Sequence, residues 1–576
     1  SRARARFGWA GHALLAAFVV GPALLSPSTR LVGNGDADVW NHTWGPWWWW
    51  HSLSEGRIPW HTDLLRAPVG GVLWFIDPVL AAAGAPLVPL VGTAAAFNLV
   101  VLGMVAFASW AAGRFARTLG AGPSAAWIAS AAYAGSAWMV CELHDGITEA
   151  VNIGPVALAM VWGEEACQNP GVRSWLKAGL GVGFAVLASP YLGLGAGIVL
   201  GIRGLAHLPV ALCGAGLASV IGALPLGLLR VQLASPLAIV RRPAGMNESL
   251  ALHNAVDPRT FIVPGFRSVD LSAEGMEHSM YLGIAALLLA TVAVVAAPRR
   301  RLPWVLGAAA AGLTSLGPWL SWDGQWLLDH RQERIALPWT WVQEIAPGLA
   351  VTHPLRLAVA ALVVVAALAA VGAERLLGRR AWLLLPAVLA DGLLVSSAPW
   401  PVAWSDATVP RALTSIARQP GDPSWSILDL PTDVGRTMAT SRYLYWQTAH
   451  HRPIPYAVDA RASTSMLLAR PAFRELARLS RGRPDEGRRL GLSATPTGRV
   501  RDLADLGVRW LVLHPELDPV AAAAIEARIA AELGPGEDID GAIRWDLGAD
   551  AAPLDSHVRQ LLHGLSADPE PRAPAR

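Results

Sequence analysis

The chain has 576 residues, of which 53% are hydrophobic and only 15% are charged, and its mean hydropathy is +0.38. Soluble domains carry about 25% charged residues, so this composition excludes a disordered chain and a plain cytosolic enzyme. The formal net charge of +3 gives no bulk attraction to nucleic acid. The three cysteines show no metal-ligand spacing and are too few for a disulfide framework. We expect a polytopic α-helical membrane protein with some soluble mass.

Mostly apolar segments recur through the first 398 residues. A helix needs about 20 such residues to cross a bilayer, and we predict about eleven transmembrane helices at 7–26, 94–113, 125–141, 150–165, 176–189, 190–206, 208–229, 279–297, 302–320, 355–374 and 381–398. The first of these is interpreted as a retained helix rather than a signal peptide. The segment 72–91 is interrupted by Asp77 and by prolines. It is predicted to be a twelfth span, or else a re-entrant or interfacial segment.

The basic loops orient these spans, because cytoplasmic loops collect Arg and Lys. Eleven spans place all six basic loops on the cytoplasmic side. A full crossing by 72–91, or a merger of two spans across Ser189–Pro190, would invert the later loops. We therefore predict a cytoplasmic N-terminus and an extracytoplasmic C-terminus.

Two domains are predicted from the change in composition. The transmembrane domain covers 1–398 and has outer loops at 27–93 and 230–278. A soluble extracytoplasmic α/β domain covers 399–576, because apolar strands alternate there with helical patterns. Its predicted elements are strand 426–430, helix 436–450, helix 500–506, strand 508–514 and helix 519–533.

The first outer loop contains two carboxylates, Asp36 and Asp38, directly before a Trp-rich run at 40–50. The run predicts a helix in the membrane interface, where Trp is enriched. The carboxylates suit a base or a metal ligand, and the alternative is that they cap that helix. Since Gly33 and Gly35 favour a non-helical approach, the helix is expected to start near Asp38. Asp38 would then be its N-cap, and Asp36 the chemical residue.

Three further groups of polar residues lie near predicted outer ends of spans. His61 and Arg66 suit a phosphate, because Arg offers a bidentate fork, or else they anchor lipid headgroups. The second outer loop holds Glu142, His144, Asp145 and Glu149. These ionisable residues indicate a functional site if they lie at membrane depth, where charges are costly, but not if they lie in water at the membrane surface.

The third group is His353 and Arg356, at the predicted outer end of the tenth span. Arg356 is the best single candidate to hold a lipid-linked phosphate. Its alternative role is that of a snorkelling residue at the end of a helix.

These features together resemble the GT-C class of membrane glycosyltransferases. The motifs that carry the resemblance are Gly35-Asp36-x-Asp38-x-Trp40-Asn41, Phe97-Asn98-Leu99, Tyr281-Leu282-Gly283, His353-Pro354-x-Arg356 and Gly507-Val508-Arg509-Trp510. Each motif is short, so the resemblance rests on the order of the motifs along most of the chain. Within the class, the chain is similar to bacterial proteins of unassigned substrate.

The resemblance implies transfer of a sugar from a polyprenyl-phosphate-linked donor to a glycan, lipid or protein acceptor. The reaction would take place on the outer face of a bacterial cytoplasmic (inner) membrane. Asp36 or Asp38 maps to the acidic base of the class, with Glu149 as a further catalytic residue. One branch of the class uses a divalent metal, so Mg or Mn is a possible cofactor here.

Two expectations complete the prediction. Asp36, Asp38, Glu149 and Arg356 are predicted to converge on one cavity, with the Asp36 and Glu149 carboxylates within about 15 Å. The alternative function is a lipid or polysaccharide transporter or flippase. Such a protein would favour charges near the middle of the spans, whereas the predicted spans are almost free of charge.

Overall fold

The structure is a computed structural model, and it describes residues 2–240, 250–251, 254, 257–265, 279–323, 325–345, 352–432, 441–457, 465–481 and 498–548. The chain forms two compact units. The helical unit comprises Ser1–Asn34, Ile76–Gly227 and Arg242–Asp406, and the sheet unit comprises Gly35–Phe75, Leu228–Arg241 and Ala407–Arg576. Most of the predicted loop 230–278 lies outside the described residues. The predicted domain division at residue 398 remains a prediction.

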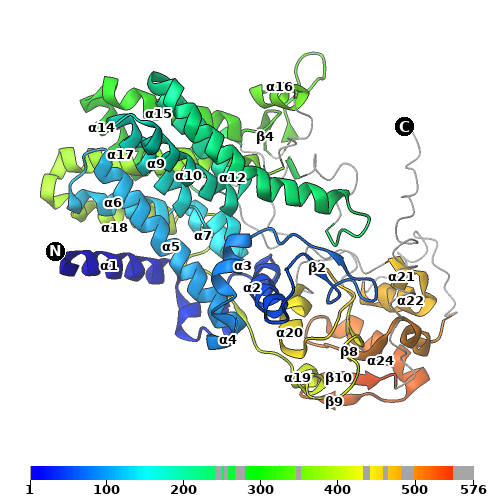
Figure 1. Cartoon of the computed structure of the whole chain (residues 1–576). Coiled ribbons are helices and arrows are strands. Elements are labelled where there is room, and N and C mark those ends of the chain that lie inside the picture. Colours follow the sequence, from blue (N-terminus) through cyan, green and yellow to red (C-terminus); the bar gives the residue numbers. More distant parts are fainter. Residues whose placement is uncertain are drawn as a thin grey trace. The chain divides into compact units, whose positions relative to one another are not determined.

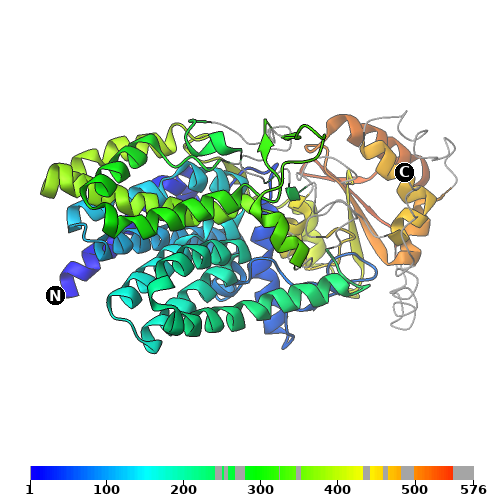
Figure 2. The ribbon, with the colours of Figure 1, turned by 90° about the horizontal axis from the view of Figure 1, so that it is seen from above.

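The longer helices of the helical unit lie where spans are predicted. They are α1 (Arg2–Val20), α5 (Thr93–Thr118), α6 (Pro123–Ala134), α7 (Ala137–Asp145), α9 (Gly154–Gln168), α10 (Val172–Ala188), α11 (Pro190–Gly204), α12 (Leu208–Ala234), α14 (Ile284–Ala296), α15 (Pro298–Ser315), α17 (Val359–Leu377) and α18 (Leu385–Leu393). Neighbouring helices of the bundle, such as α5, α6, α9 and α17, pack on one another (Figure 1), and from above they run roughly side by side (Figure 2).

Three helical stretches of the described chain are long and apolar enough to cross a membrane. They are Thr93–Thr118, Pro190–Ala234 and Pro354–Leu393. The last stretch begins with the 3-10 helix η5 (Pro354–Ala358) and passes through a second one, η6 (Gly378–Leu384). The count of eleven crossings and the orientation of the termini remain predictions.

The helix breaks follow local residue chemistry. The predicted break at Ser189–Pro190 is confirmed, because Ser189 is extended and α11 starts with Pro190 at a favoured position. The continuous span predicted over 125–141 is wrong. That segment divides into α6 and α7 after Gly135, where the Ser136 side chain caps α7 by accepting the Met139 N–H at 3.2 Å.

The ambiguous segment 72–91 contains two short helices, α3 (Pro78–Gly84) and α4 (Val88–Val91). Seven residues of α-helix span about 10 Å, against about 30 Å for the hydrocarbon core. Neither helix is therefore a twelfth transmembrane helix.

Small residues bring the helices of the bundle into close contact. A Cβ atom at Gly372 on α17 would lie 1.8 Å from the carbonyl oxygen of Leu289 on α14. A Cβ at Gly179 on α10 would lie 2.1 Å from the carbonyl oxygen of Gly214 on α12. Because association of helices in membranes depends on such close backbone approach, larger residues at these positions would separate the helices.

The sheet unit is built on a four-stranded sheet with the order β7-β8-β10-β9. The parallel strands β7 (Ser426–Leu430) and β8 (Val508–Leu513) form its buried half, and β10 (Ala542–Asp546) and β9 (Glu537–Ile539) continue it antiparallel. The other elements are α2 (Val39–Ser54), β2 (His61–Thr62), β3 (Gly71–Val72), α19 (Arg411–Ala417), α20 (Arg442–His450), α21 (Ser465–Ala469), α22 (Pro471–Ser480), η8 (Val500–Leu506) and α24 (Pro519–Leu533). The predicted strand 426–430 and helix 519–533 are confirmed to the residue.

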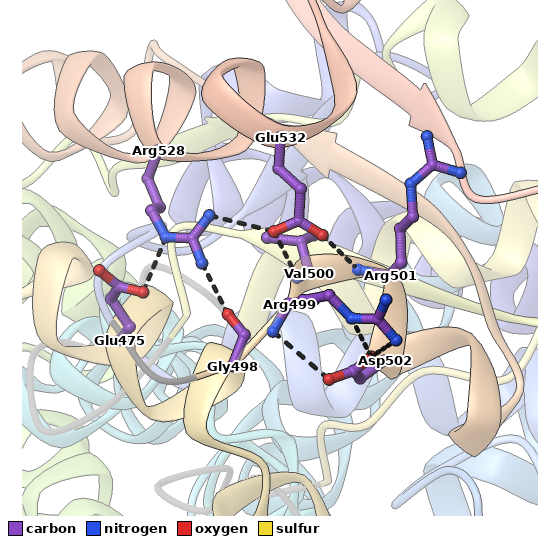
Figure 3. Close-up of polar contacts among 8 residues, drawn as sticks. All are labelled: Glu475, Gly498, Arg499, Val500, Arg501, Asp502, Arg528 and Glu532. Carbon is purple, nitrogen blue, oxygen red and sulfur yellow. Dashed lines mark hydrogen bonds and ion pairs between the residues drawn. The ribbon is translucent and has the colours of Figure 1, made fainter. Parts of the chain in front are cut away.

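A polar network joins the helices that flank this sheet (Figure 3). Arg528 on α24 donates to Glu475 on α22 at 2.7 Å and to the carbonyl of Gly498 at 2.8 Å. Glu532, one turn later, accepts the backbone N–H groups of Val500 and Arg501 at the start of η8. Two charged side chains of one helix thereby position the chain that leads into β8.

The Trp-rich helix is placed differently from its prediction. α2 packs on α20 within the sheet unit, and Trp40, Trp44, Trp47 and Trp48 are at most 1% exposed. The Trp44 indole N–H donates to the side-chain oxygen of Gln447 at 2.8 Å. The expectation of a helix lying in the membrane interface is therefore wrong for these four rings, because protein rather than lipid covers them.

Candidate functional site

A cluster of buried ionisable residues lies in the helical unit, carried by α3, α7, α8 (Thr148–Val151) and η5. Asp77 is the N-cap of α3, and Pro78 takes the first helical position. Its Oδ1 accepts the Leu80 N–H at 2.9 Å, and its Oδ2 accepts the Thr148 hydroxyl at 2.6 Å. The fully buried carboxylate is thus fixed both to its own helix and to α8.

Glu149 and Arg356 form a buried ion pair in this cluster. Their Oε1 and Nη1 atoms are 3.0 Å apart, and the side chains are only 6% and 9% exposed. A carboxylate oxygen of Glu149 also lies within 4.8 Å of one of Asp77. The carboxylate of Glu142, 1% exposed on α7, interacts with the charge of Arg356 as well. One guanidinium is therefore grouped with three buried carboxylates.

This excess of negative charge changes the ionisation of Asp77. Burial, and then the neighbouring carboxylate of Glu149, raise the pKa of Asp77 to about 7, although the hydrogen bonds from Thr148 and the backbone favour the charged form. A further positive charge here would restore the ionised state. Two carboxylates at this separation are also the hard oxygen ligands that Mg or Mn prefers, so the donor set fits a divalent cation.

His144 and Asp145 sit at the last turn of α7. His144 Nδ1 lies 2.9 Å from Asp145 Oδ1, and Asp145 is fully buried. The His144 carbonyl accepts the backbone N–H of Asn34 at 2.6 Å. Gly146 ends the helix in the left-handed region at φ 71°. The backbone of His144 therefore connects the end of α7 to the chain that follows α1.

The approach to Arg356 is held by the first turn of α11. The Tyr191 hydroxyl lies 2.7 Å from Thr352 Oγ1 and accepts the Thr352 N–H at 3.0 Å. Thr352 Oγ1 is in turn 2.8 Å from His353 Nδ1. The His353 carbonyl accepts the N–H of Arg356 at 3.3 Å. His353 thus lies next to the cluster as a residue that shapes η5.

The other predicted acidic residues, Asp36 and Asp38, belong to the sheet unit. Asp38 is the N-cap of α2, as predicted. Its Oδ1 accepts the side-chain amide of Asn41 at 3.2 Å, in place of the expected bond from a backbone N–H. Glu149 and Arg356 belong to the helical unit, so their convergence with Asp36 and Asp38 remains a prediction.

His61 and Arg66, the predicted phosphate-binding residues, also lie in the sheet unit. His61 is in β2, half exposed, with Nδ1 3.9 Å from Asp63 Oδ1. The Arg66 guanidinium donates to the carbonyl of Ala238 at 2.7 Å. Arg66 is at φ 53°, and its backbone N–H donates to Tyr456 at 2.9 Å. These bonds give Arg66 a structural part in the sheet unit.

Sequence reasoning missed Asp77 and Thr148 as members of the cluster. The local signal was present, because an Asp directly before a Pro is a typical helix start. From the sequence alone, Asp77 is only a charge that interrupts an apolar segment. Thr148 is close to Glu149 in sequence, but nothing in the sequence indicates that its hydroxyl bonds a residue 71 positions earlier.

No known protein family matches the sequence, and no curated protein matches it either. Among solved structures, the arabinofuranosyltransferase AftD from Mycobacteria aligns with 96% of this chain and 40% of its own, with a TM-score of 0.53 and 15% identity. The chain has a GT-C-type fold. The resemblance expected from the motif order is confirmed at the level of the fold. The chain spans 40% of the length of AftD.

An oligosaccharyltransferase from Archaeoglobus fulgidus is a further match. Its structure in complex with Zn and sulfate aligns with 88% of this chain and 68% of its own, at 13% identity and a TM-score of 0.43. Its complex with an inhibitory peptide and a dolichol-phosphate aligns with 89% and 69%, also at 13% identity, with a TM-score of 0.44.

Proposed function

We propose that this chain is a GT-C-type glycosyltransferase that moves a sugar from a polyprenyl-phosphate-linked donor to an acceptor at the outer face of a bacterial cytoplasmic membrane. The observation that carries the proposal is the buried cluster of Asp77, Glu149 and Arg356 within a fold like that of an arabinofuranosyltransferase. The acceptor is a glycan, a lipid or a protein. The N-terminus is cytoplasmic and the C-terminal domain extracytoplasmic in this proposal.

The chemistry needs a base for the acceptor hydroxyl and positive charge for the departing phosphate. We assign the base to Asp36, with Asp38 in support as the N-cap of α2. Arg356 stabilises the phosphate, because a guanidinium is always charged and forms paired bonds to phosphate oxygens. The pair with Glu149 holds Arg356 in place before the donor binds.

Asp77 and Glu149 would hold a divalent cation, Mg or Mn, that supplies further positive charge for the leaving phosphate. Their side chains fit this role by donor type, by separation and by the excess of negative charge around Arg356. His144 and Asp145, at the last turn of α7, are assigned to substrate binding. His61, Arg66 and His353 are assigned to substrate binding, with Arg66 and His353 acting chiefly through the chain segments that they hold.

The test is transfer by the full chain in proteoliposomes. A radiolabelled polyprenyl-phosphate arabinofuranose and the corresponding hexose donors are supplied with glycan, lipid and protein acceptor fractions. The expected result is movement of label into one fraction with release of polyprenyl phosphate. Asp77→Asn should lower transfer at least tenfold. Asp505→Asn is the control. That carboxylate is exposed, lies in the sheet unit and forms a long ion pair with Arg470, with 3.9 Å between the two charged atoms.

A different outcome separates the alternative function. If labelled donor crosses the bilayer without transfer to any acceptor, the protein is a transporter or flippase. If neither process occurs with any donor while the protein stays folded, the proposed function is wrong.

A further inference from the structure

Between α15 and η5 the chain builds a small platform, which comprises the described residues 318–323 and 325–337. The hairpin strands β4 (Ser321–Trp322) and β5 (Gln325–Trp326) pair antiparallel, and isolated bridges join Trp319 to Ala336 and Leu328 to Arg334. The backbone N–H of Leu337 donates to the carbonyl of Pro318 at 2.9 Å, which closes the platform at its base. The platform thus begins and ends at the same place, just beyond the end of α15.

Cation–π contacts stiffen the platform. The Arg334 guanidinium lies 3.8 Å from the Trp326 ring and 4.9 Å from that of Trp319. The Arg259 guanidinium lies 4.1 Å from the Trp322 ring and pairs with Asp257 and Asp323. Arg259 belongs to the 3-10 helix Pro258–Phe261, about sixty residues earlier in the chain. Its contacts therefore connect the platform to another segment of the helical unit.

The helix α16 (Pro338–Ile345) follows the platform directly (Figure 1). Trp339 is 7% exposed and fixes its inner side. Trp341, Val342 and Ile345 lie within one third of the helix circumference, and they are 64%, 36% and 87% exposed. A rigid element therefore presents a Trp, a Val and an Ile together, on one face, to the surroundings of the helical unit.

The position of α16 along the chain indicates what contacts its exposed apolar face. α16 ends nine residues before Pro354, where the apolar helical stretch Pro354–Leu393 begins. The platform follows α15 after Ser315. The elements before and after α16 in the chain, α15 and η5, both belong to the helical unit. Trp is enriched at the membrane surface because its ring is apolar and its N–H stays wet.

The charges of this segment indicate which part of a lipid α16 would contact. Residues 316–345 carry more carboxylates than guanidiniums, namely Asp323, Asp329, Glu333 and Glu344 against Arg331 and Arg334. This balance gives no attraction to anionic headgroups. Contact with lipid would depend on apolar burial in the acyl-chain boundary, as for other interfacial helices.

We propose that α16 is a membrane-interface helix, and that its Trp341–Val342–Ile345 face is buried in the lipid at the surface from which the Pro354–Leu393 stretch enters the bilayer. The contact is with lipid acyl chains and does not require anionic headgroups. This surface is independent of the transfer reaction proposed above.

The test uses the full chain in phosphatidylcholine nanodiscs, with the three native cysteines replaced by alanine. A nitroxide is attached through Trp341→Cys or, as the control, through His330→Cys on the exposed turn of the platform. We expect the nitroxide at 341 to collide mainly with oxygen, which concentrates in lipid, and that at 330 to collide mainly with a water-soluble nickel complex. Adding phosphatidylglycerol should leave both values unchanged.

Two outcomes would overturn the proposal. Equal access of the nickel complex to positions 341 and 330 would place α16 in water. Exclusion of both oxygen and nickel at 341 would mean that protein, such as a second copy of the chain, covers the face. Ile345→Cys repeats the measurement if Trp341→Cys does not fold, and it must give the same result as position 341.

Discussion

The hydroxyl of Tyr191 holds Thr352 by two hydrogen bonds, one to Oγ1 at 2.7 Å and one from the backbone N–H at 3.0 Å. Tyr191 is in the first turn of α11, and Thr352 directly precedes the turn that carries Arg356. The contact between the two segments is close, because a Cβ at Gly195 would lie 2.6 Å from the Leu357 carbonyl oxygen. The position of Arg356 therefore depends on α11.

We predict that Tyr191→Phe lowers transfer by up to about tenfold, since a positioning hydrogen bond contributes about 1 kcal/mol. Thr352→Ser keeps the hydroxyl and should retain activity, whereas Thr352→Val loses the Oγ1 contacts with Tyr191 and His353 but keeps the backbone N–H bond to Tyr191. The double variant should lose less than the sum of the two single losses, because both remove the bond between the two hydroxyls. The measurement is kcat/KM in proteoliposomes. Full activity of Tyr191→Phe, in a preparation where Arg356→Lys is impaired, would show that α11 does not position Arg356.

Variants of the Glu149–Arg356 pair should affect the stability of the protein and its transfer activity differently. Arg356→Met leaves a buried carboxylate without its cation, which should lower the free energy of unfolding by about 3–5 kcal/mol. Combining it with Glu149→Gln removes the uncompensated charge and should restore much of that loss, but not the transfer activity. Thermal unfolding in detergent measures the first effect and label transfer the second. Recovery of transfer in the double variant would remove Arg356 from the chemistry.

Asp36 and Asp38 are predicted to differ in their roles. Asp36→Asn keeps the shape and removes the base, so transfer should fall by roughly 10²–10⁴-fold. Asp38→Asn keeps a good N-cap for α2 and should cost far less. The comparison needs equal amounts of folded protein, judged by elution from a sizing column. An inactive Asp38 variant beside an active Asp36 variant would reverse the assignment.

Chelation tests the carboxylate pair. Treatment with EDTA should abolish transfer, and Mg or Mn should restore it, because Asp77 and Glu149 would hold the cation. In Asp77→Asn, more added metal should be needed for half-maximal activity. A fully active EDTA-treated enzyme would show that the reaction needs no cation, and Asp77 would then act through its own charge alone.

The network in Figure 3 predicts how the sheet unit responds to acid. Partial burial opposes ionisation of Glu532, but the N–H groups of Val500 and Arg501 and the Arg528 guanidinium outweigh it and lower the pKa of Glu532. Its contribution, about 1–3 kcal/mol, is therefore present above the ordinary Glu pKa and is lost as the pH falls through the lowered value.

Hydrogen exchange at η8 measures this contribution. Glu532→Gln should speed exchange of the Val500 and Arg501 amides near neutral pH. The difference from the unmodified protein should shrink as the pH falls through the lowered pKa of Glu532. Glu526→Gln, on the same helix, is the control and should change neither amide. A difference that does not shrink at any acid pH would mean that the ionised form of Glu532 is not what stabilises η8.

The sequence predicted helices well wherever burial in an apolar medium determines them. Apolar runs and prolines predict α5, α11 and α17, and the alternation of apolar strands with helical patterns predicts β7 and α24. The Trp-rich helix α2 was misplaced because lipid and a protein core accept Trp rings equally well. The tertiary contacts, among them the bond from Trp44 to Gln447, show that protein covers these rings.

The candidate site was predictable in part for the same reason. Glu149 and Arg356 stand out because charges beside apolar runs are costly. Asp77 does not stand out, because its role depends on Thr148, which the fold brings to it from 71 residues away. Contacts of this kind have no local pattern in the chain.

The pairing of Glu149 with Arg356 also constrains the biosynthesis of the protein. Arg356 is synthesised more than two hundred residues after Glu149, a delay of roughly 10–40 s at ordinary translation rates. Throughout that interval the carboxylate at the end of the early helices has no guanidinium to neutralise it. It must stay hydrated or hold a proton while the intervening helices enter the membrane. The ion pair can form only once η5 has been made, so this part of the bundle is completed together with the stretch Pro354–Leu393, which enters the membrane after Arg356.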